Sequence, residues 1–80
     1  MTEKRLLIVA HAPSPNPARL RDAIAAGAGH PDIDGVCVQV LSPFEAGPDD
    51  VRAAQAVILG TTENLGYMSG ALKDFFDRIY

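Results

Sequence analysis

The distribution of apolar and polar residues along the chain predicts three strands. Two short runs, Leu6–Ala10 and Ala56–Leu59, contain no polar side chain. Runs without polar alternation are typical of buried parallel strands that are covered on both faces. A third run, Val36–Leu41, contains Cys37 and Gln39. We therefore expect the first two runs in buried positions and the third at an edge of the sheet.

The segment after the first run carries the signals of a helix start. Asn16 is followed by Pro17, which predicts that Asn16 caps the helix and that Pro17 takes the first helical position, where its missing N–H leaves nothing unsatisfied. The helix is expected to turn an apolar face toward the sheet, formed by Leu20, Ala23 and Ile24. Its polar residues are expected to face water: Arg19, Arg21 and Asp22.

Two further helices are predicted after the second and third strands. Residues 48–54 can form about two helical turns, with Asp49 and Asp50 near the N-terminus, where the helix dipole favours acids. Residues 61–68 are expected to be a polar turn, and Ser69 to cap a last helix. That helix has an apolar face at helical spacing: Leu72, Phe75, Phe76 and Ile79. Its other face is expected to be solvated: Lys73, Asp74, Asp77 and Arg78.

Alternation of strands and helices indicates an α/β fold with a parallel sheet and helices on both faces. The strand order 2-1-3 places the run with Cys37 and Gln39 at one edge and residues 56–60 at the other. This is the beginning of a flavodoxin-like doubly wound arrangement, a three-layer αβα sandwich. Because the chain has 80 residues and no linker or repeat, we expect one domain over residues 1–80.

Composition excludes several classes of function. The net charge is −3 and no basic stripe is present, so nucleic acid is not an expected partner. Cys37 is the single cysteine, which rules out an internal disulfide and fits a reducing compartment. No apolar run approaches the ~20 residues of a membrane span. We expect a soluble, cytoplasmic protein without a membrane partner.

A resemblance to a known family rests on Thr62–Lys73, which reads TENLGYMSGALK, and on the Phe76-Asp77-Arg78 that follows. This segment resembles the second flavin loop of flavodoxin-like NAD(P)H-dependent FMN reductases. The first turn resembles the phosphate loop of the same family at three positions: His11, Ser14 and Asn16. It departs from that loop at three others: Ala12, Pro15 and Pro17.

The resemblance implies an FMN-dependent oxidoreductase or electron-transfer protein with NAD(P)H as the reductant. The flavin would carry the chemistry, so neither a catalytic side chain nor a metal is expected. The implied phosphate contacts are His11, Ser14 and Asn16, with Arg19 as a compensating cation. The implied isoalloxazine contacts lie in the second loop: Thr61, Thr62, Glu63, Asn64, Gly66 and Tyr67. Whether Asn64 or Tyr67 stacks on the ring is left open.

Two expectations qualify this interpretation. Prolines at 13, 15 and 17 remove three N–H donors from the phosphate loop, so FMN is expected to bind loosely. The alternative is a flavodoxin-like structural or interaction domain that has lost flavin binding.

The edge formed by residues 56–60 carries no charge or proline that would discourage pairing. We therefore expect either an incomplete domain, lacking its last strands, or a homo-oligomer. Such an oligomer would pair through this strand and pack three aromatic residues against the partner: Phe75, Phe76 and Tyr80.

Overall fold

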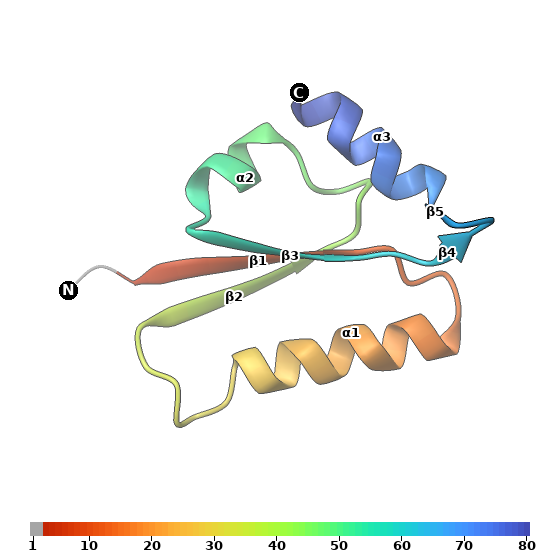
Figure 1. Cartoon of the computed structure of the whole chain (residues 1–80). Helices are drawn as coiled ribbons and strands as arrows, with labels where there is room; N and C mark the ends of the chain where they lie inside the picture. Colours follow the sequence, from red (N-terminus) through yellow and green to blue (C-terminus); the bar gives the residue numbers. More distant parts are fainter. Residues whose placement is uncertain (1–2) are drawn as a thin grey trace.

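A computed structural model describes residues 3–80 of the chain and contains a three-stranded parallel sheet, a short hairpin and three helices. Figure 1 shows the sheet between two helical layers, with α1 on one face and α2 and α3 on the other. The elements in chain order are β1 (Lys4–Ala10), α1 (Pro15–Ala28), β2 (Val36–Leu41), α2 (Pro48–Ala53), β3 (Ala56–Gly60), β4 (Glu63–Asn64), β5 (Tyr67–Met68) and α3 (Gly70–Ile79).

The sheet has the predicted order β2-β1-β3, with all strands parallel. β1 is the central strand, and its last four residues, 7–10, are buried. Lys4 lies opposite Val36 at the start of β2, and Ala10 lies opposite Gly60 at the end of β3. The α/β class, the parallel sheet and its order are therefore confirmed.

The compact core lies on the α2 and α3 face of the sheet. Its buried residues come from β1, the loop before α2, and α3: Leu7, Val9, Ala46, Leu72 and Phe75. Leu72 and Phe75 are 3 % and 1 % exposed, and Phe76 and Ile79 pack beside them. The predicted apolar face of α3 is confirmed. Because Phe75 is buried inside its own chain, the expectation that it packs against a partner is wrong.

The expectation that the Ala56–Leu59 run is buried is also wrong. β3 is an edge strand, and Val57 and Leu59 are 39 % and 44 % exposed. The sequence of β3 is as apolar as that of β1, but burial depends on what lies beside a strand as well as on its composition. In residues 3–80, no strand pairs with the outer edge of β3.

Helix α1 begins earlier and faces differently than predicted. Ser14 is the N-cap and Pro15 the first helical residue, so Asn16 is in the first turn rather than at the cap. Leu20 is 64 % exposed, whereas the half-buried positions of the helix are 17, 18, 21, 24, 25 and 28. Arg21 is therefore on the inward face, which corrects the prediction that it is solvated. Proline is favoured at the first position of a helix, and Pro15 takes the position that we had predicted for Pro17.

The N-termini of the other two helices are formed as predicted. Ser69 is the N-cap of α3, and its Oγ accepts a hydrogen bond from the Leu72 N–H at 3.2 Å. In α2, Asp49 and Asp50 lie in the first turn, and the Asp50 carboxylate accepts from the Gly47 N–H at 2.9 Å. These contacts satisfy backbone donors that a helix start leaves free.

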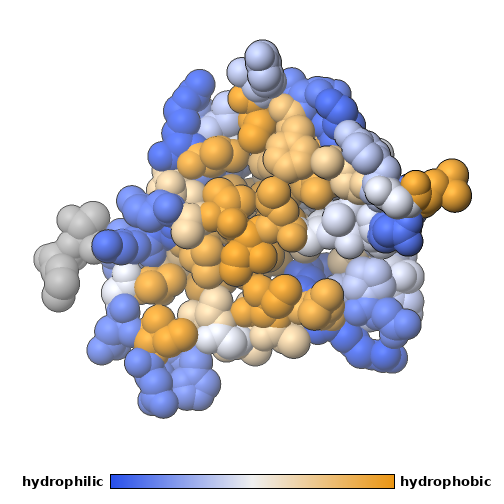
Figure 2. Space-filling model, viewed as in Figure 1, coloured by the Kyte–Doolittle hydropathy of each residue, from blue (hydrophilic) through white to orange (hydrophobic). Residues whose placement is uncertain are grey.

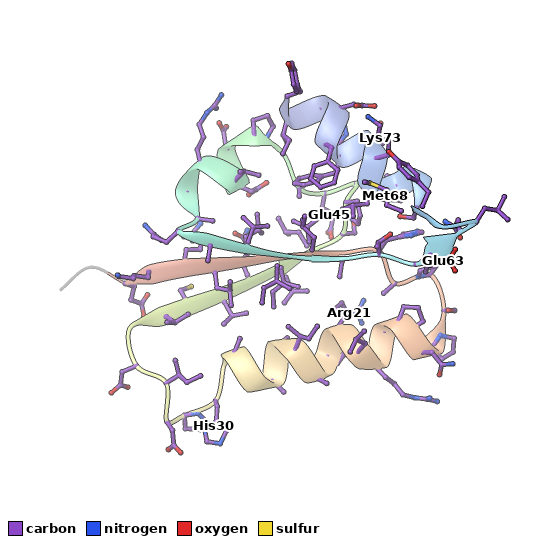
Figure 3. All side chains as sticks on the ribbon, viewed as in Figure 1. Arg21, His30, Glu45, Glu63, Met68 and Lys73 are labelled. Atoms are coloured by element: carbon purple, nitrogen blue, oxygen red, sulfur yellow. The ribbon has the colours of Figure 1, made fainter. Side chains whose placement is uncertain are left out.

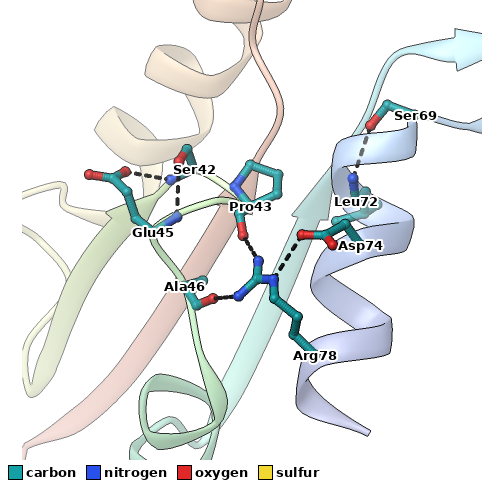
Figure 4. Close-up of polar contacts among 8 residues, drawn as sticks. All are labelled: Ser42, Pro43, Glu45, Ala46, Ser69, Leu72, Asp74 and Arg78. Carbon is teal, nitrogen blue, oxygen red and sulfur yellow. Dashed lines mark hydrogen bonds and ion pairs between the residues drawn. The ribbon is translucent and has the colours of Figure 1, made fainter.

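The polar side chains of α3 form ion pairs and hydrogen bonds in addition to contacting water. Lys73 pairs with Asp77 at 2.7 Å, and Arg78 pairs with Asp74 at 2.8 Å. Figure 4 shows that Arg78 also reaches the loop before α2, where it donates to the carbonyl oxygens of Pro43 and Ala46. The prediction that Arg78 is simply solvated is wrong, because its guanidinium fastens α3 to that loop.

Two further observations concern the single cysteine and the length and polarity of the helices. Cys37 is half-buried in β2 and not in a disulfide. Among residues 3–80, none of the helices combines the length and the apolar character that crossing a membrane requires.

Candidate functional site

Three loops lie at the carboxyl end of the parallel sheet, the edge at which open α/β sheets bind ligands. They follow β1, β2 and β3, respectively. The His11 N–H donates to the Gly60 carbonyl at 3.0 Å, which ties the end of β1 to the end of β3. A Cβ added at Gly60 would lie 3.1 Å from the Ala10 Cβ. Glycine at this position therefore allows the two strand ends to approach closely.

A cavity of about 280 Å³ lies between α1 and the sheet, next to these strand ends. Its lining residues come from β1, α1, β3 and the adjoining loops: Ile8, Ala10, His11, Asn16, Pro17, Leu20, Arg21, Ile24, Ile58, Gly60 and Thr61. The isoleucines and Leu20 make most of its wall apolar, and the polar groups gather at the carboxyl end of the strands. Such a distribution, apolar walls with a few convergent polar groups, is typical of small-molecule sites.

Among the polar residues that line the cavity, His11 has a buried side-chain atom without a hydrogen-bond partner. Its Nδ1 is buried and has no partner among the described residues, although a buried polar nitrogen without a hydrogen bond is unfavourable. The His11 ring meets the Phe44 ring edge to face, with the centroids 6.4 Å apart. Phe44 itself is 67 % exposed. An exposed aromatic ring therefore flanks the polar end of the cavity.

The start of α1 offers few donors to an anion. Pro15 and Pro17 have no N–H, and the Ala18 N–H already donates to the Ser14 carbonyl at 3.2 Å. The side-chain Oδ1 of Asn16 accepts a hydrogen bond from Arg19 Nη1 at 2.8 Å. The Ala18 amide is therefore engaged in the first turn of the helix and is not available to a phosphate. The side chain of Ser14 makes no capping bond, so its hydroxyl and the Asn16 N–H are the local groups that can still donate.

Within the predicted polar turn of residues 61–68, residues 63–68 form a β-hairpin. Glu63 pairs with Met68 and Asn64 with Tyr67 in antiparallel register. Leu65 and Gly66 connect them with φ values of 53° and 79°. Two consecutive positive φ values are those of a type I′ turn, which fits the twist of a hairpin but disfavours leucine. Figure 3 shows the hairpin, with Glu63 and Met68 labelled, projecting from the end of the sheet.

The hairpin is held by its own polar side chains. The Thr61 hydroxyl accepts from the Ser69 N–H and donates to the Thr62 carbonyl, both at 2.8 Å. The Glu63 carboxylate accepts from the Gly66 N–H. These groups fix the base and the tip of the hairpin, so the Thr61 hydroxyl and the Gly66 amide are engaged within the chain. Both groups stabilise the hairpin itself.

The tip and one side of the hairpin present apolar groups to solvent. Leu65 is fully exposed and Tyr67 is 55 % exposed. Apart from Gly66 itself and its two chain neighbours, no described residue has an atom within 4 Å of the place where a Cβ would stand at Gly66. A flat ligand can therefore approach the backbone at the tip closely, beside two apolar side chains.

A positive charge lies at the start of the helix that follows. Asp77 raises the pKa of the Lys73 amine, first by accepting a hydrogen bond from it and then by its negative charge, while desolvation opposes the shift. Lys73 therefore remains a cation throughout the physiological pH range. Because its Nζ lies 2.7 Å from the Asp77 carboxylate, this cation is paired rather than free.

The structure brings together only part of the predicted site. His11, Asn16 and Thr61 line the cavity, whereas Ser14 and Arg19 are exposed and do not line it. Four of the predicted ring contacts lie in the hairpin, outside the cavity lining: Glu63, Asn64, Gly66 and Tyr67. Thr62 joins β3 to this hairpin and is half-buried.

Sequence reasoning missed three residues that the structure places at this end of the sheet or in the cavity: Arg21, Phe44 and Leu65. Phe44 and Leu65 are large apolar residues in loops that follow strands. That combination is a usable signal, because loops normally carry polar side chains. No comparable sequence signal marks Arg21, because its place on the inward face depends on the rotation of α1 about its own axis.

Within residues 3–80, no three His, Cys, Asp or Glu side chains are grouped so that they could hold a metal ion. Comparison of the chain with protein-family models, with curated proteins and with solved structures found no match.

Proposed function

We propose that this chain is a flavodoxin-like flavin-binding domain that passes electrons or hydride from NAD(P)H through FMN. One observation carries the proposal. The loop after β1 and the hairpin after β3 resemble the two flavin loops of FMN reductases, and these segments, distant in sequence, adjoin the ends of neighbouring strands. A ligand that contacts both loops would lie at the carboxyl end of the sheet, where doubly wound folds bind their cofactors.

The hairpin fits the ring of a flavin. An isoalloxazine ring needs a flat, partly apolar surface and backbone that can approach it closely. Tyr67 and Leu65 supply exposed apolar surface, and Gly66 leaves its backbone uncovered. Tyr67 is the aromatic residue of the hairpin, so we assign the stacking contact to Tyr67 rather than to Asn64.

The start of α1 fits a phosphate less well. Ser14 and the Asn16 N–H remain as donors, with Arg19 nearby, while the prolines supply none. Each missing charge-assisted hydrogen bond is worth roughly 1.5–3 kcal/mol. The loss of two would weaken binding by about a hundredfold or more. FMN is therefore expected to bind with little advantage over riboflavin, which lacks the phosphate.

When bound, the flavin supplies the redox chemistry. The chain's own residues would hold and shield it. His11 would offer its unpartnered Nδ1 to a polar edge of the ligand, and Tyr67 would cover one ring face. Thr61 and Glu63 would keep the hairpin in place through the hydrogen bonds that they already make.

Flavin titration followed by fluorescence quenching tests this proposal. We expect Tyr67→Ala to weaken the binding of FMN and riboflavin alike, by about tenfold, because the stacking of one ring on an aromatic side chain is worth about 1–3 kcal/mol. Tyr80→Ala is the matched control, since Tyr80 is fully exposed at the other end of α3. Equal affinities for the two variants and the unchanged chain would contradict the assignment. A preference for FMN over riboflavin by several orders of magnitude would contradict the weak phosphate site.

Gly66→Val is a poor test of the same loop. The φ of 79° at Gly66 is strained for any other residue, so valine would disturb the hairpin as well as block a ligand. Leu65→Asn is preferable because asparagine tolerates a positive φ and the Asn-Gly pair favours a type I′ turn. It removes the apolar tip and leaves the hairpin formed.

A second candidate function is an interaction domain that binds no flavin. It is favoured by the internal hydrogen bonds of Thr61 and of the Gly66 amide, which leave these groups unavailable to a ligand. The same titration separates the two functions. The absence of quenching with both FMN and riboflavin, together with the absence of flavin reduction by NADH or NADPH, would support the interaction domain.

A further inference from the structure

A second exposed aromatic side chain stands at the carboxyl end of the sheet, in the loop after β2. Phe44 is 67 % exposed and meets the His11 ring edge to face. Figure 2 shows other hydrophobic residues at the centre of the face along which β3 runs in Figure 1. In flavodoxin-like sheets, the fourth and fifth strands join on that β3 side. Because β2 lies at the opposite edge, those strands do not account for the exposure of Phe44.

The loop that carries Phe44 is held by hydrogen bonds on both sides of this residue. The Glu45 carboxylate accepts from the Ser42 N–H at 2.8 Å, and the Ser42 Oγ accepts from the Glu45 N–H at 3.2 Å. Arg78 donates to two carbonyl oxygens of the same loop (Figure 4). A large apolar side chain that a fixed loop directs into water is typical of a recognition residue.

The charge next to Phe44 is negative. Glu45 is exposed, and its Oε1 accepts from Ser42 while its second oxygen has further capacity to accept. Helices α1 and α3 begin at this end of the sheet, and each of their basic residues already makes a hydrogen bond or ion pair within the chain: Arg19, Arg21, Lys73 and Arg78. A ligand at Phe44 therefore meets a carboxylate and no unengaged cation of these two helices.

We propose that Phe44 and Glu45 bind the adenosine half of the reductant and select NADH over NADPH. This inference rests on the proposed function, in which a nicotinamide dinucleotide reduces the flavin. Purine rings stack on aromatic side chains, and Phe44 offers an exposed ring for that contact. The Glu45 carboxylate would accept a hydrogen bond from the ribose 2′-OH of NADH, as acidic residues do in other doubly wound folds. NADPH carries a phosphate at that position, which the same carboxylate repels.

The position of the loop suits a dinucleotide whose other ring lies at the hairpin. Neighbouring strands are about 4.8 Å apart, so the ends of β2 and β3, with β1 between them, are about 10 Å apart. In a dinucleotide, two riboses and a pyrophosphate separate the adenine from the nicotinamide. The nicotinamide can therefore reach a flavin at Tyr67 while the adenine contacts Phe44.

NMR titration with ADP-ribose and its 2′-phosphorylated form tests the adenosine site without flavin. These ligands are the parts of the two reductants that remain without the nicotinamide. We expect ADP-ribose to shift the ring signals of Phe44, which Phe44→Leu identifies among the three phenylalanines, and to leave those of the buried Phe75 in place. The phosphorylated form should bind about tenfold more weakly. Unshifted Phe44 signals, or equal or tighter binding of the phosphorylated form, would overturn the proposal.

Glu45→Gln isolates the effect of the charge. Glutamine keeps a side-chain oxygen that can accept from the Ser42 N–H, so the loop stays formed, but the negative charge is gone. We expect the preference for ADP-ribose to fall by about tenfold. Asp34→Asn is the matched control, because it changes the net charge equally and lies before β2, at the opposite end of the sheet. An unchanged preference in Glu45→Gln, or an equal change in Asp34→Asn, would overturn the selection by Glu45.

Flavin reduction separates this inference from the proposed function. In the chain loaded with FMN, Phe44→Ala should raise the KM for NADH by about tenfold. It should leave kcat nearly unchanged, because the adenine is remote from the reacting ring. An unchanged KM would overturn the role of Phe44 even though the flavin binds. Conversely, a chain that binds ADP-ribose at Phe44 but binds no flavin would support the adenosine site and contradict the proposed function.

Discussion

The two faces of the sheet differ in how their helices are attached. On one face, α3 contributes two buried residues over ten positions and is fastened by Arg78 and capped by Ser69. On the other face, α1 has fourteen residues, none of them buried, and a cavity of about 280 Å³ lies beneath it. The longer helix therefore contributes less to the core. Length and helix signals alone do not show how strongly a helix is bound to its sheet.

The largest expected difference between the faces is in side-chain truncation. Leu72→Ala on α3 should lower the free energy of unfolding by about 2–5 kcal/mol, since it leaves a cavity in the core. Leu20→Ala on α1 should change it by less than about 1 kcal/mol, because that side chain is largely exposed. Urea unfolding monitored by circular dichroism measures both. Equal losses would show that α1 is packed as tightly as α3.

Arginine provides the next contrast. Arg78→Ala should lower the free energy of unfolding by roughly 1.5–3 kcal/mol, because it removes charge-assisted donors from two backbone carbonyls. Arg19→Ala removes an exposed contact with Asn16 on α1 and should have an effect within about 0.5 kcal/mol. The same urea experiment compares them. A loss for Arg19→Ala as large as that for Arg78→Ala would contradict the stronger attachment of α3.

The two helix caps should differ by a smaller amount. Ser69→Ala removes a hydrogen bond to the Leu72 N–H and should cost about 1 kcal/mol. Ser14 occupies the N-cap of α1 without a side-chain bond, so Ser14→Ala should be close to neutral. Thermal unfolding of the two variants is a sufficient measurement. A lower melting temperature for Ser14→Ala than for Ser69→Ala would reverse the comparison.

The smallest expected effect is a change in the pKa of Lys73. Asp77 raises the pKa of Lys73 in the folded chain. The ion pair therefore stabilises the folded chain fully at pH values below the ordinary pKa of lysine. That contribution is lost as pH rises through the raised value. Asp77→Asn should return the Lys73 pKa toward its ordinary value, as followed by NMR of the lysine side chain. An unchanged pKa in that variant would show that Asp77 is not the cause.

Local signals predicted most of the fold. The strand order, α2 and the cap and apolar face of α3 followed from periodicity and from residues such as Ser69 and Asp50, whose roles depend only on near neighbours in the chain. The rotation of α1 did not, because Pro15 moved the helix start away from Asn16 and the apolar positions 20 and 23 stayed in solvent. Such rotation depends on packing against the sheet.

The candidate site was less predictable than the fold. The motif at 62–73 located a segment but did not show that residues 63–68 pair as a hairpin, since no Asn-Gly or Asp-Gly stands at its turn. Thr61 was expected to contact a ligand, whereas in the structure its hydroxyl accepts a hydrogen bond from the Ser69 N–H. Hydrogen bonds between a loop and its own flanks depend on distances that spacing in the sequence does not give.

Leu65 has a consequence for which substitutions the chain tolerates. Its φ of 53° costs a non-glycine residue roughly 1–2 kcal/mol, and its side chain makes up for none of this because it is fully exposed. A library of variants at position 65 that is selected for folding alone should therefore enrich asparagine and glycine. A library selected for what the hairpin contacts should instead keep leucine or another large apolar residue. Divergence between the two selections would identify the tip of the hairpin as a position maintained for recognition.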